Sequence, residues 1–247
     1  MRLYIMQMGN FAIIPKDGSP RMDIPVPAYL IQTDDGTNVL VDTGFSSAAI
    51  AAAKEPGYTG PLLGEAIPIT DALAQIGVRP EDVRYLVATH LDPDHAGGTD
   101  LFPNAEIVVQ QAHYDAARSG QYERYQMTRA HWDVEGLRYR FVNGDTELLP
   151  GITLIESSGH GPGHQSVLVR LPETGPVLLA IDAITRNPGD MLPEERPDNP
   201  MDVDSAAARV SVRKLTDLAE HEGVTRIVYG HDANEWKTLK KSPVYYQ

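Results

Sequence analysis

Four side chains that can bind metal ions stand within six residues in the segment Thr89-His90-Leu91-Asp92-Pro93-Asp94-His95-Ala96-Gly97-Gly98. The segment directly follows an apolar run, Tyr85–Ala88, that we expect to form a strand. A tight turn at the end of a strand directs several side chains into one small volume. Imidazole nitrogens suit zinc and other first-row divalent ions, and carboxylate oxygens suit harder ions. The segment therefore favours a metal site over a solvated surface loop.

The same arrangement recurs at three other predicted strand ends: His160 and His164 follow Ile152–Ile155, Asp182 follows Val177–Ile181, and His231 follows Arg226–Tyr229. Enzymes that alternate strands and helices collect their active sites at the carboxyl ends of strands. A single His at a strand end is more often a structural hydrogen-bonding group than a ligand. Four such strand ends in one chain predict one shared site.

The composition restricts this site to His and carboxylate ligands. The 247-residue chain contains no cysteine, which excludes disulfides, cysteine-ligated zinc and thiol nucleophiles. Its 34 Asp and Glu against 21 Lys and Arg give a net charge of −13, and such a surface repels the phosphate backbone of nucleic acids. No apolar run reaches the roughly 18 residues of a membrane span, and the N-terminus lacks a signal-peptide core. We therefore expect a cytoplasmic protein with no nucleic-acid or membrane partner.

Strands and helices alternate along the whole chain, which predicts an α/β or α+β fold. Further strands are expected at Leu3–Met8, Val26–Ile31, Val39–Val41, Ile107–Val109 and Ser166–Val169. Helices are expected from a cap at Thr70-Asp71 to Ile76, over Gln111–Ser119, and from Asp204 or Ser205 to His221 with an apolar stripe of Val210, Leu215 and Leu218.

Two stretches rich in Pro and Gly, Gly44–Pro68 and Arg186–Asp202, predict long loops. A wall of a binding site and a solvated connection are equally good interpretations of each. The length and the ordinary hydrophobic content of 42% suit either one large domain or two closely associated halves, and we expect a single domain over residues 1–247.

Together these motifs resemble the signature of the metallo-β-lactamase superfamily, His-x-His-x-Asp-His followed by a distant His, a distant Asp and a final His. Within the superfamily the chain is most similar to the N-acyl-homoserine lactone lactonases, which are quorum-quenching hydrolases. The resemblance rests on Val41–Gly44, His90–Gly98, Gly159–Ser166, Leu179–Ala183 and Tyr229–Asp232. It implies a four-layer αββα sandwich with two divalent metal ions between the sheets at one edge, zinc being the first choice and manganese, iron or cobalt the alternatives.

The resemblance also implies a role for each matching residue. One ion would be held by His90, Asp92 and His160, the other by Asp94, His95 and His231, and Asp182 would bridge the two. Asp42 would steady the ligand loops and His164 would support them, although a purely structural role suits both residues equally well. A metal-bridging hydroxide would attack the lactone carbonyl, and Asp94 would pass a proton to the leaving alkoxide. The alternative for Asp94 is a plain ligand without a proton role.

The sequence departs from the signature at Asp92, which replaces the second His. Two divalent ions, a bridging hydroxide and the carboxylates of Asp92, Asp94 and Asp182 add up to a neutral core, whereas the usual pattern leaves one positive charge. The added negative charge predicts weaker Lewis acidity and a preference for manganese or iron over zinc. We hypothesise two ions with a weaker first site. The alternative is that Asp92 misses the metal and that the first site is weak or empty.

A second departure is Thr185. In the lactonase branch a Tyr stands three residues after the bridging Asp and assists the substrate carbonyl, and the hydroxyl of Thr185 has a much shorter reach. We expect a water molecule or another residue to substitute, and the candidates are Tyr58, Tyr122 and Tyr125.

Apolar loop residues that could line a groove for an acyl chain are Phe11, Ile13, Ile14, Leu62, Leu63, Ile67 and Met191. Ordinary packing beneath the loops is the better interpretation of any one of them.

Three functional hypotheses follow. The leading one is a hydrolase of small-molecule lactones, N-acyl-homoserine lactone first among them. The second is another hydrolase on the same site, either a phosphotriesterase or a glyoxalase II-like thioesterase, for which Arg213, Lys214, Lys237, Lys240 and Lys241 are a sparse anion-binding cluster. The third is a degenerate homologue that binds without turnover, which the retention of every other ligand disfavours. By resemblance we also expect a homodimer.

Overall fold

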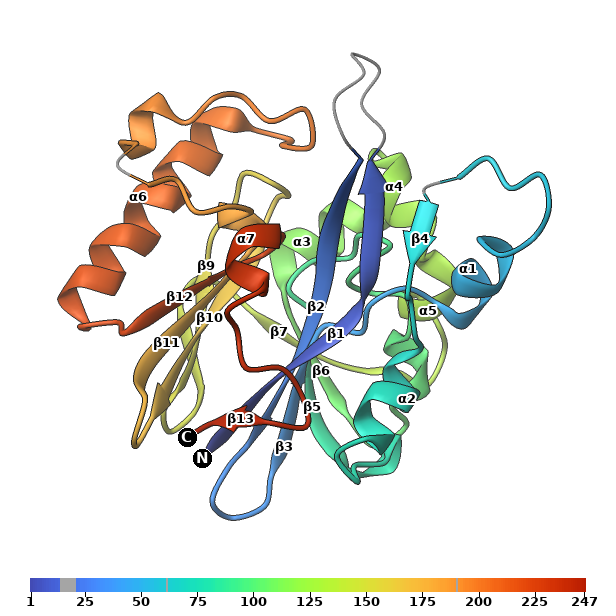
Figure 1. Cartoon of the computed structure of the whole chain (residues 1–247), viewed down its shortest axis with the longest axis horizontal. Helices are drawn as coiled ribbons and strands as arrows, with labels where there is room; N and C mark the ends of the chain where they lie inside the picture. The colour runs from blue at the N-terminus through green and yellow to red at the C-terminus, as the bar shows by residue number, and fades with distance from the viewer. Residues whose placement is uncertain (14–20, 61, 190) are drawn as a thin grey trace.

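Two β-sheets lie face to face in this computed structural model, which describes residues 1–13, 21–60, 62–189 and 191–247, and helices cover the outer side of each sheet (Figure 1). The larger sheet has the strand order β13-β1-β2-β3-β5-β6-β7, with β4 paired to β1. The smaller sheet has the order β12-β11-β10-β9-β8. The layers are helix, sheet, sheet and helix, which confirms the predicted αββα sandwich.

The larger sheet consists of β1 (Arg2–Ile13), β2 (Met22–Gln32), β3 (Asn38–Val41), β4 (Leu62–Gly64), β5 (Val83–Val87), β6 (Glu106–Gln110), β7 (Arg138–Val142) and β13 (Tyr245–Tyr246). The smaller sheet consists of β8 (Thr146–Leu149), β9 (Ile152–Glu156), β10 (Gln165–Leu171), β11 (Gly175–Ile181) and β12 (Arg226–Tyr229). The helices are α1 (Ser47–Ala52), α2 (Ile69–Ala74), α3 (Gln111–Arg118), α4 (Glu123–Gln126), α5 (Arg129–Trp132), α6 (Ser205–His221) and α7 (Ala233–Trp236).

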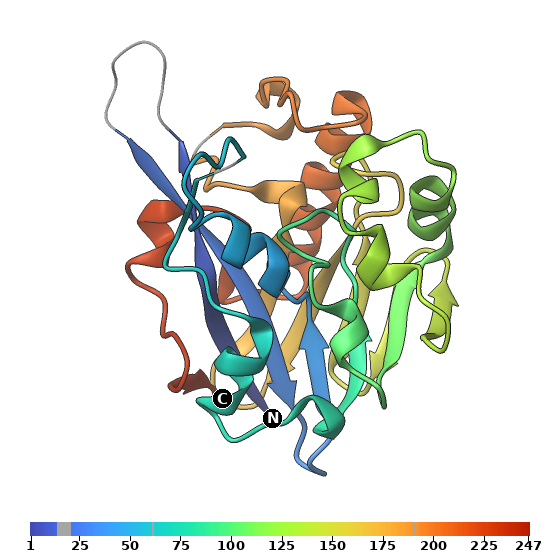
Figure 2. The ribbon, with the colours of Figure 1, turned by 90° about the vertical axis from the view of Figure 1, so that its right-hand side faces the viewer.

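The central strands are apolar on both faces because both faces are covered. Side chains alternate along a strand, so Val39 and Val41 of β3 point between the sheets while Leu40 packs in the core under the outer helices. On β11, Leu179 likewise points between the sheets and Leu178 packs in the core that includes α6. This explains why these strands read as continuous apolar runs. Figure 2 shows the helices between residues 47 and 132 in front of the larger sheet.

A strand is present at every predicted position, and the structure adds β4, β7, β8 and β13. The predicted long loop Gly44–Pro68 is wrong in part, because it contains α1 and β4. Ser46 starts α1 by accepting a hydrogen bond from the Ala49 amide at 3.1 Å, and β4 pairs with β1. Within its described residues, the second predicted loop, 186–202, holds a single 3-10 turn, Pro193–Glu195.

The helix α6 has the predicted bounds, and Asp204 caps it by accepting hydrogen bonds from two amides of its first turn. The predicted apolar stripe is wrong at Val210, which is 69% exposed. Successive residues of a helix are about 100° apart, so the buried positions are instead Ala208, Ser211, Val212 and Leu215. The helix α3 matches its prediction, whereas α2 starts earlier than predicted, after Pro68.

The strand order brings distant motifs together. Because β3 and β5 are parallel, as are β11 and β12, the turns after these strands lie at the same edge of the sandwich, together with the turn after β9. None of the helices in the described part of the chain has the length and apolar character needed to cross a membrane.

Candidate metal centre

The turns after four strands, β5, β9, β11 and β12, bring all seven predicted ligands together at one edge of the two sheets. Their donor atoms form three overlapping groups, within each of which the atoms lie within 4.8 Å of one another: His90, Asp92 and His160; Asp94, His95 and His231; and His90, His95 and Asp182. Six of these residues are buried, and the side chain of His231 is 11% exposed.

Asp182 lies between the first two groups. Its Oδ2 is 3.4 Å from Nε2 of His160 and 3.9 Å from Nε2 of His90. Its Oδ1 is 3.1 Å from Nε2 of His231 and 3.6 Å from Nε2 of His95. Each carboxylate oxygen therefore faces one group, which is the geometry needed to bridge two ions.

Several donor atoms of the cluster have no hydrogen-bond partner among the described residues. They include Nε2 of His90, Nε2 of His95 and Oδ1 of Asp182, all of them buried. A buried polar atom left without a partner costs about 1–3 kcal/mol, and a bound ion satisfies such atoms. The nitrogen and carboxylate donors therefore fit two divalent ions.

Asp42 orients one imidazole in each group. Its Oδ2 accepts hydrogen bonds from Nδ1 of His95 at 2.8 Å and from Oγ1 of Thr89 at 2.7 Å. Because the Thr89 hydroxyl donates to Asp42, its oxygen is free to accept from Nδ1 of His90, 3.0 Å away. Both rings then carry a proton on Nδ1 and direct Nε2 toward the centre of the cluster.

The other two imidazoles differ at Nδ1. The ring of His231 donates to the backbone carbonyl of Pro25 at 2.8 Å. In His160, Nδ1 has no hydrogen-bond partner among the described residues and lies 3.7 Å from Oδ1 of Asp202, whose Oδ2 lies 2.5 Å from Nη1 of Arg196. Each Nε2 again points inward.

His164 supports the backbone of Asp182 and is not among the clustered donor groups. Burial lowers the pKa of His164 to about 3, so the ring is neutral at pH 7. Its Nε2 accepts a hydrogen bond from the Asp182 amide at 3.3 Å, and its Nδ1 lies 2.9 Å from Oγ of Ser157.

The residue before Asp182 has a strained backbone. Ile181 has φ of 53°, in the left-handed region that a β-branched residue rarely adopts. Gly230 passes so close that a Cβ there would lie 2.5 Å from the Ile181 carbonyl oxygen and 2.8 Å from Oδ1 of Asp182. The turn around Asp182 is therefore fixed by close packing on both sides.

The carboxylates and imidazoles of the cluster shift one another's pKa values. Burial opposes protonation of His160, but Asp182, Asp202 and Asp92 raise its pKa to about 9. Burial likewise opposes ionisation of Asp182, but His231, His95 and His160 hold its pKa well below the usual range. A bound cation must therefore displace protons from imidazoles.

Arg124, on α4, is a residue of the site that sequence reasoning missed. Its Nε lies 3.0 Å from Oδ1 of Asp92. The other oxygen of Asp92, Oδ2, lies 3.1 Å from Nε2 of His160 and 3.4 Å from Nε2 of His90. Asp92 itself is the sequence signal that predicts a nearby cation such as Arg124. A buried carboxylate added to an acidic cluster is costly unless a positive charge lies beside it.

A cavity of 570 Å³, the metal cavity, opens above the cluster. Its lining combines Asp92, Asp94, His160, Asp182 and His231 with Phe11, Ala12, Ile24, Thr185, Arg186, Asn199 and Met201. The three tyrosines predicted as substitutes at the Thr185 position do not line it. The hydroxyl of Tyr125, for example, accepts a hydrogen bond from Arg124 at 3.1 Å, and its residue is fully buried.

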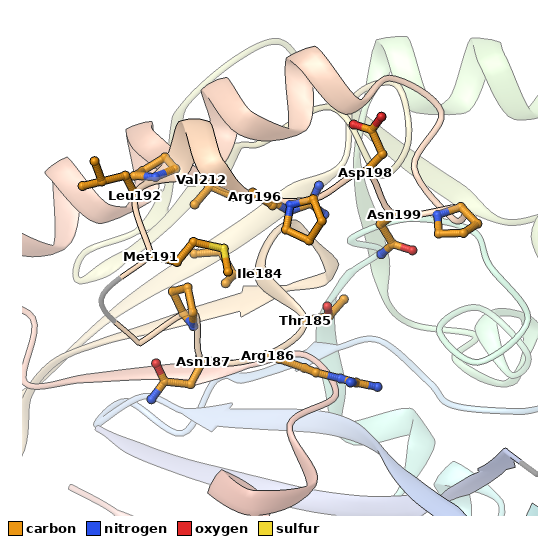
Figure 3. A pocket seen from close by; sticks show the side chains of 14 residues that line it. Ile184, Thr185, Arg186, Asn187, Met191, Leu192, Arg196, Asp198, Asn199 and Val212 are labelled. Carbon is orange, nitrogen blue, oxygen red and sulfur yellow. The ribbon is translucent and has the colours of Figure 1, made fainter. Parts of the chain in front are cut away.

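A second cavity of 490 Å³ lies beneath the segment 186–200 and shares Thr185, Arg186 and Asn199 with the metal cavity. Figure 3 shows apolar side chains, among them Met191 and Leu192, on one side of it and these three shared residues on the other.

Of the predicted groove residues, Phe11 lines the metal cavity and Met191 lines the second cavity. Leu63 and Ile67 pack against the core instead. Ile14 lies outside the described residues, and the side chains of Ile13 and Leu62 are not described.

Comparison with known proteins agrees with this geometry. Residues 21–231 match the metallo-beta-lactamase superfamily. An N-acyl homoserine lactonase of a Bacillus species is 34% identical over 235 residues, covering 91% of this chain and 88% of the relative. The N-acyl homoserine lactonase AttM of Rhizobium johnstonii is 36% identical over 274 residues, covering 100% and 98%. A solved N-acyl homoserine lactone hydrolase, with the product N-hexanoyl-L-homoserine bound at its catalytic metal center, has a TM-score of 0.84 and 29% identity, covering 99% of this chain and 98% of that one.

Proposed function

The chain belongs to the metallo-beta-lactamase superfamily, and we infer that it is a metal-dependent hydrolase that opens the ester ring of N-acyl homoserine lactones. The observation that carries this inference is Asp182, whose two carboxylate oxygens face two separate groups of ligands. The cluster lies at the floor of a cavity large enough for a small amphiphilic substrate. A pair of divalent ions held in this way suits hydrolysis of an ester at neutral pH.

We propose that both ions are zinc, because four imidazole nitrogens face the cluster. The first ion would be held by His90, Asp92 and His160, the second by Asp94, His95 and His231, with Asp182 shared. When bound, the ions supply Lewis acidity, which activates water and polarises the lactone carbonyl.

Asp94 is placed to handle the proton of the leaving group. Its side chain lines the metal cavity, with Oδ2 at 3.4 Å from Nε2 of His95 and 3.7 Å from Nε2 of His231. It can therefore touch both the cluster and a bound lactone. We propose that Asp94 takes up the proton that the attacking water releases and donates it to the ring oxygen as the ester bond breaks.

Thr185 is placed to orient the substrate. Its backbone carbonyl accepts a hydrogen bond from the His231 amide at 2.9 Å, which ties it to the cluster, and it lines both cavities. Because its hydroxyl is short, we propose that it shares the hydrogen bonds to the polar groups of the substrate with Arg186 and Asn199, which line the same wall.

The apolar wall of the metal cavity suits the acyl chain. Phe11 packs edge-on against Phe45 at 5.0 Å between ring centroids and so presents a fixed apolar surface. Ile24 and Met201 extend this wall. An acyl chain longer than the metal cavity can continue past Thr185 into the second cavity.

No observation favours a thioesterase that acts on glutathione. Two of the predicted cations pair elsewhere, Arg213 with Glu194 and Lys214 with Asp145. Among the described residues that line the metal cavity, Arg186 is the only cation.

A pH-indicator assay with purified, zinc-loaded protein tests the proposed function. The substrates are homoserine lactones with acyl chains of several lengths, a lactone without an acyl chain, a thioester and a phosphotriester. We expect acyl homoserine lactones to be hydrolysed with the highest kcat/KM, and Asp182→Asn protein to serve as the inactive control. Turnover confined to the thioester or the phosphotriester would overturn the proposal.

A further inference from the structure

The guanidinium of Arg124 is anchored behind the candidate metal centre, outside the metal cavity. Its Nη1 donates to the Met201 carbonyl at 2.7 Å, and its Nη2 donates to the His160 carbonyl at 2.6 Å. The side chain of Arg124 is only 18% exposed. With both terminal nitrogens held by carbonyl groups, its Nε remains beside Asp92.

The carboxylate of Asp92 is divided between two partners. Oδ1 lies 3.0 Å from Nε of Arg124, whereas Oδ2 lies among the nitrogens of His90 and His160. With Oδ1 beside the cation, a single oxygen faces the cluster. Asp92 therefore presents one donor atom, as an imidazole in its place would.

We propose that Arg124 is a positioning residue that supplies the counter-charge of Asp92, so that the pair replaces one neutral imidazole ligand in the first ion site. This inference rests on the proposed two-ion function. Arg124 returns one positive charge to a centre that the sequence alone predicts to be neutral. The charge-based reason for expecting weaker Lewis acidity and a preference for harder ions is thereby removed.

The charge argument predicts that Asp92 and Arg124 tolerate replacement together better than apart. In Asp92→His protein the guanidinium of Arg124 loses its carboxylate partner. It then repels the metal ion in the first site, because like charges at this range repel each other. In Arg124→Gln protein the extra carboxylate is uncompensated and attracts a cation more strongly. In the double variant both charges are gone and the usual neutral ligand is restored.

Zinc chloride titrations of chelator-stripped protein, followed by calorimetry, test this cycle without relying on catalysis. We expect Asp92→His to lower the affinity for the first equivalent of zinc about tenfold or more. Adding Arg124→Gln to the Asp92→His protein should restore that affinity. We expect Arg124→Gln alone to tighten that equivalent and to move the acid limb of the lactonase pH profile upward, because a more negative site stabilises the protonated state of bound water. If Arg124 only tethers the backbone, Arg124→Gln weakens zinc binding in both backgrounds, and this result overturns the proposal.

Two further variants keep the experiment decisive. Arg124→Lys preserves the positive charge but lacks the planar guanidinium, so we expect its affinity for zinc to be close to that of the parent protein. A loss of affinity as large as that in Asp92→His protein overturns the proposal. This test remains valid even if the Arg124→Gln protein does not fold. Arg129→Gln, on the neighbouring helix α5, removes a cation that pairs with Asp133 at 2.7 Å and serves as the matched control, with unchanged zinc binding. Zinc binding is measured independently of lactone turnover, so failure of this proposal is distinguishable from failure of the proposed function.

Discussion

Replacing Asp42 by Asn tests whether one buried carboxylate fixes the proton positions on both His90 and His95. Asp42 has φ of 60°, and Asn is among the few residues that tolerate this left-handed conformation. The variant therefore keeps the backbone and the side-chain shape. It changes one oxygen acceptor into a nitrogen donor.

The expected effect follows from the three hydrogen bonds that Asp42 accepts. They come from the Thr89 amide at 2.9 Å, from Oγ1 of Thr89 at 2.7 Å and from Nδ1 of His95 at 2.8 Å. If the amide nitrogen of the introduced Asn takes the place of Oδ2, it faces the two donors Oγ1 of Thr89 and Nδ1 of His95. If it takes the place of Oδ1, it faces the backbone amide of Thr89. At least one hydrogen bond is therefore lost in either orientation. Hydrogen bonds to charged groups are worth about 1.5–3 kcal/mol. We therefore expect metal binding to weaken about tenfold to hundredfold.

The assay is competition for zinc between the stripped protein and a chromophoric chelator. Asp217→Asn, an exposed position on α6, is the matched control and should bind zinc as the parent protein does. Far-UV circular dichroism of the metal-free proteins should be the same for all three, because the backbone is unchanged. An Asp42→Asn protein that binds two zinc equivalents as tightly as the parent would refute the proposed orienting role.

Three further predictions concern the charge, packing and protonation of the site. Asp182→Asn should lose at least one metal equivalent and most of the activity together, measured by elemental analysis and lactone turnover, whereas full activity with two equivalents would contradict the bridging role. Gly97→Ala should lower the free energy of unfolding by about 1–3 kcal/mol, because a Cβ there would lie 2.1 Å from the Ser46 amide nitrogen; an unchanged urea midpoint would show that the turn can move. Burial lowers the pKa of His113 to about 4 from its ordinary value of 6.5, and its neutral Nε2 accepts from the Leu91 amide at 2.9 Å. The unfolded chain therefore binds this proton first, and between pH 7.5 and 5.5 the metal-free protein should lose about 1 kcal/mol of stability that His113→Gln protein does not lose; equal pH dependence of the urea midpoint in the two proteins argues against this.

The ligand set could be predicted from the sequence because its geometry is local to strand ends. His90, Asp94 and His95 follow one apolar strand within a few residues, and parallel pairing brings the ends of neighbouring strands to one edge. The resemblance supplied the partners of these residues, and the structure places all of them together. Their roles as ligands, the single domain, the homodimer and the cytoplasmic location stay predictions.

The remaining features depend on packing between distant segments, which periodicity does not report. Arg124 contacts Asp92 only because α4 packs beside the turn after β9. In the sequence, the neighbouring Tyr122 and Tyr125 are the residues predicted to contact the substrate, instead of Arg124. Val210 reads as part of an apolar stripe, but it faces solvent. The strand β7 escaped prediction because Arg138 and Arg140 interrupt its apolar residues, as suits an edge strand.

The left-handed backbone at Ile181 adds to the cost of folding that bound metal ions would offset. A strained residue of this kind costs about 1–3 kcal/mol, and the metal-free chain bears that cost beside a cluster of buried carboxylates. Ions that bind only the folded chain add a stabilisation that grows with the logarithm of their free concentration. When ions are scarce, we expect the turn around Ile181 to be where hydrogen exchange and proteolysis first report opening, so that metal supply governs how long the protein persists as well as how fast it works.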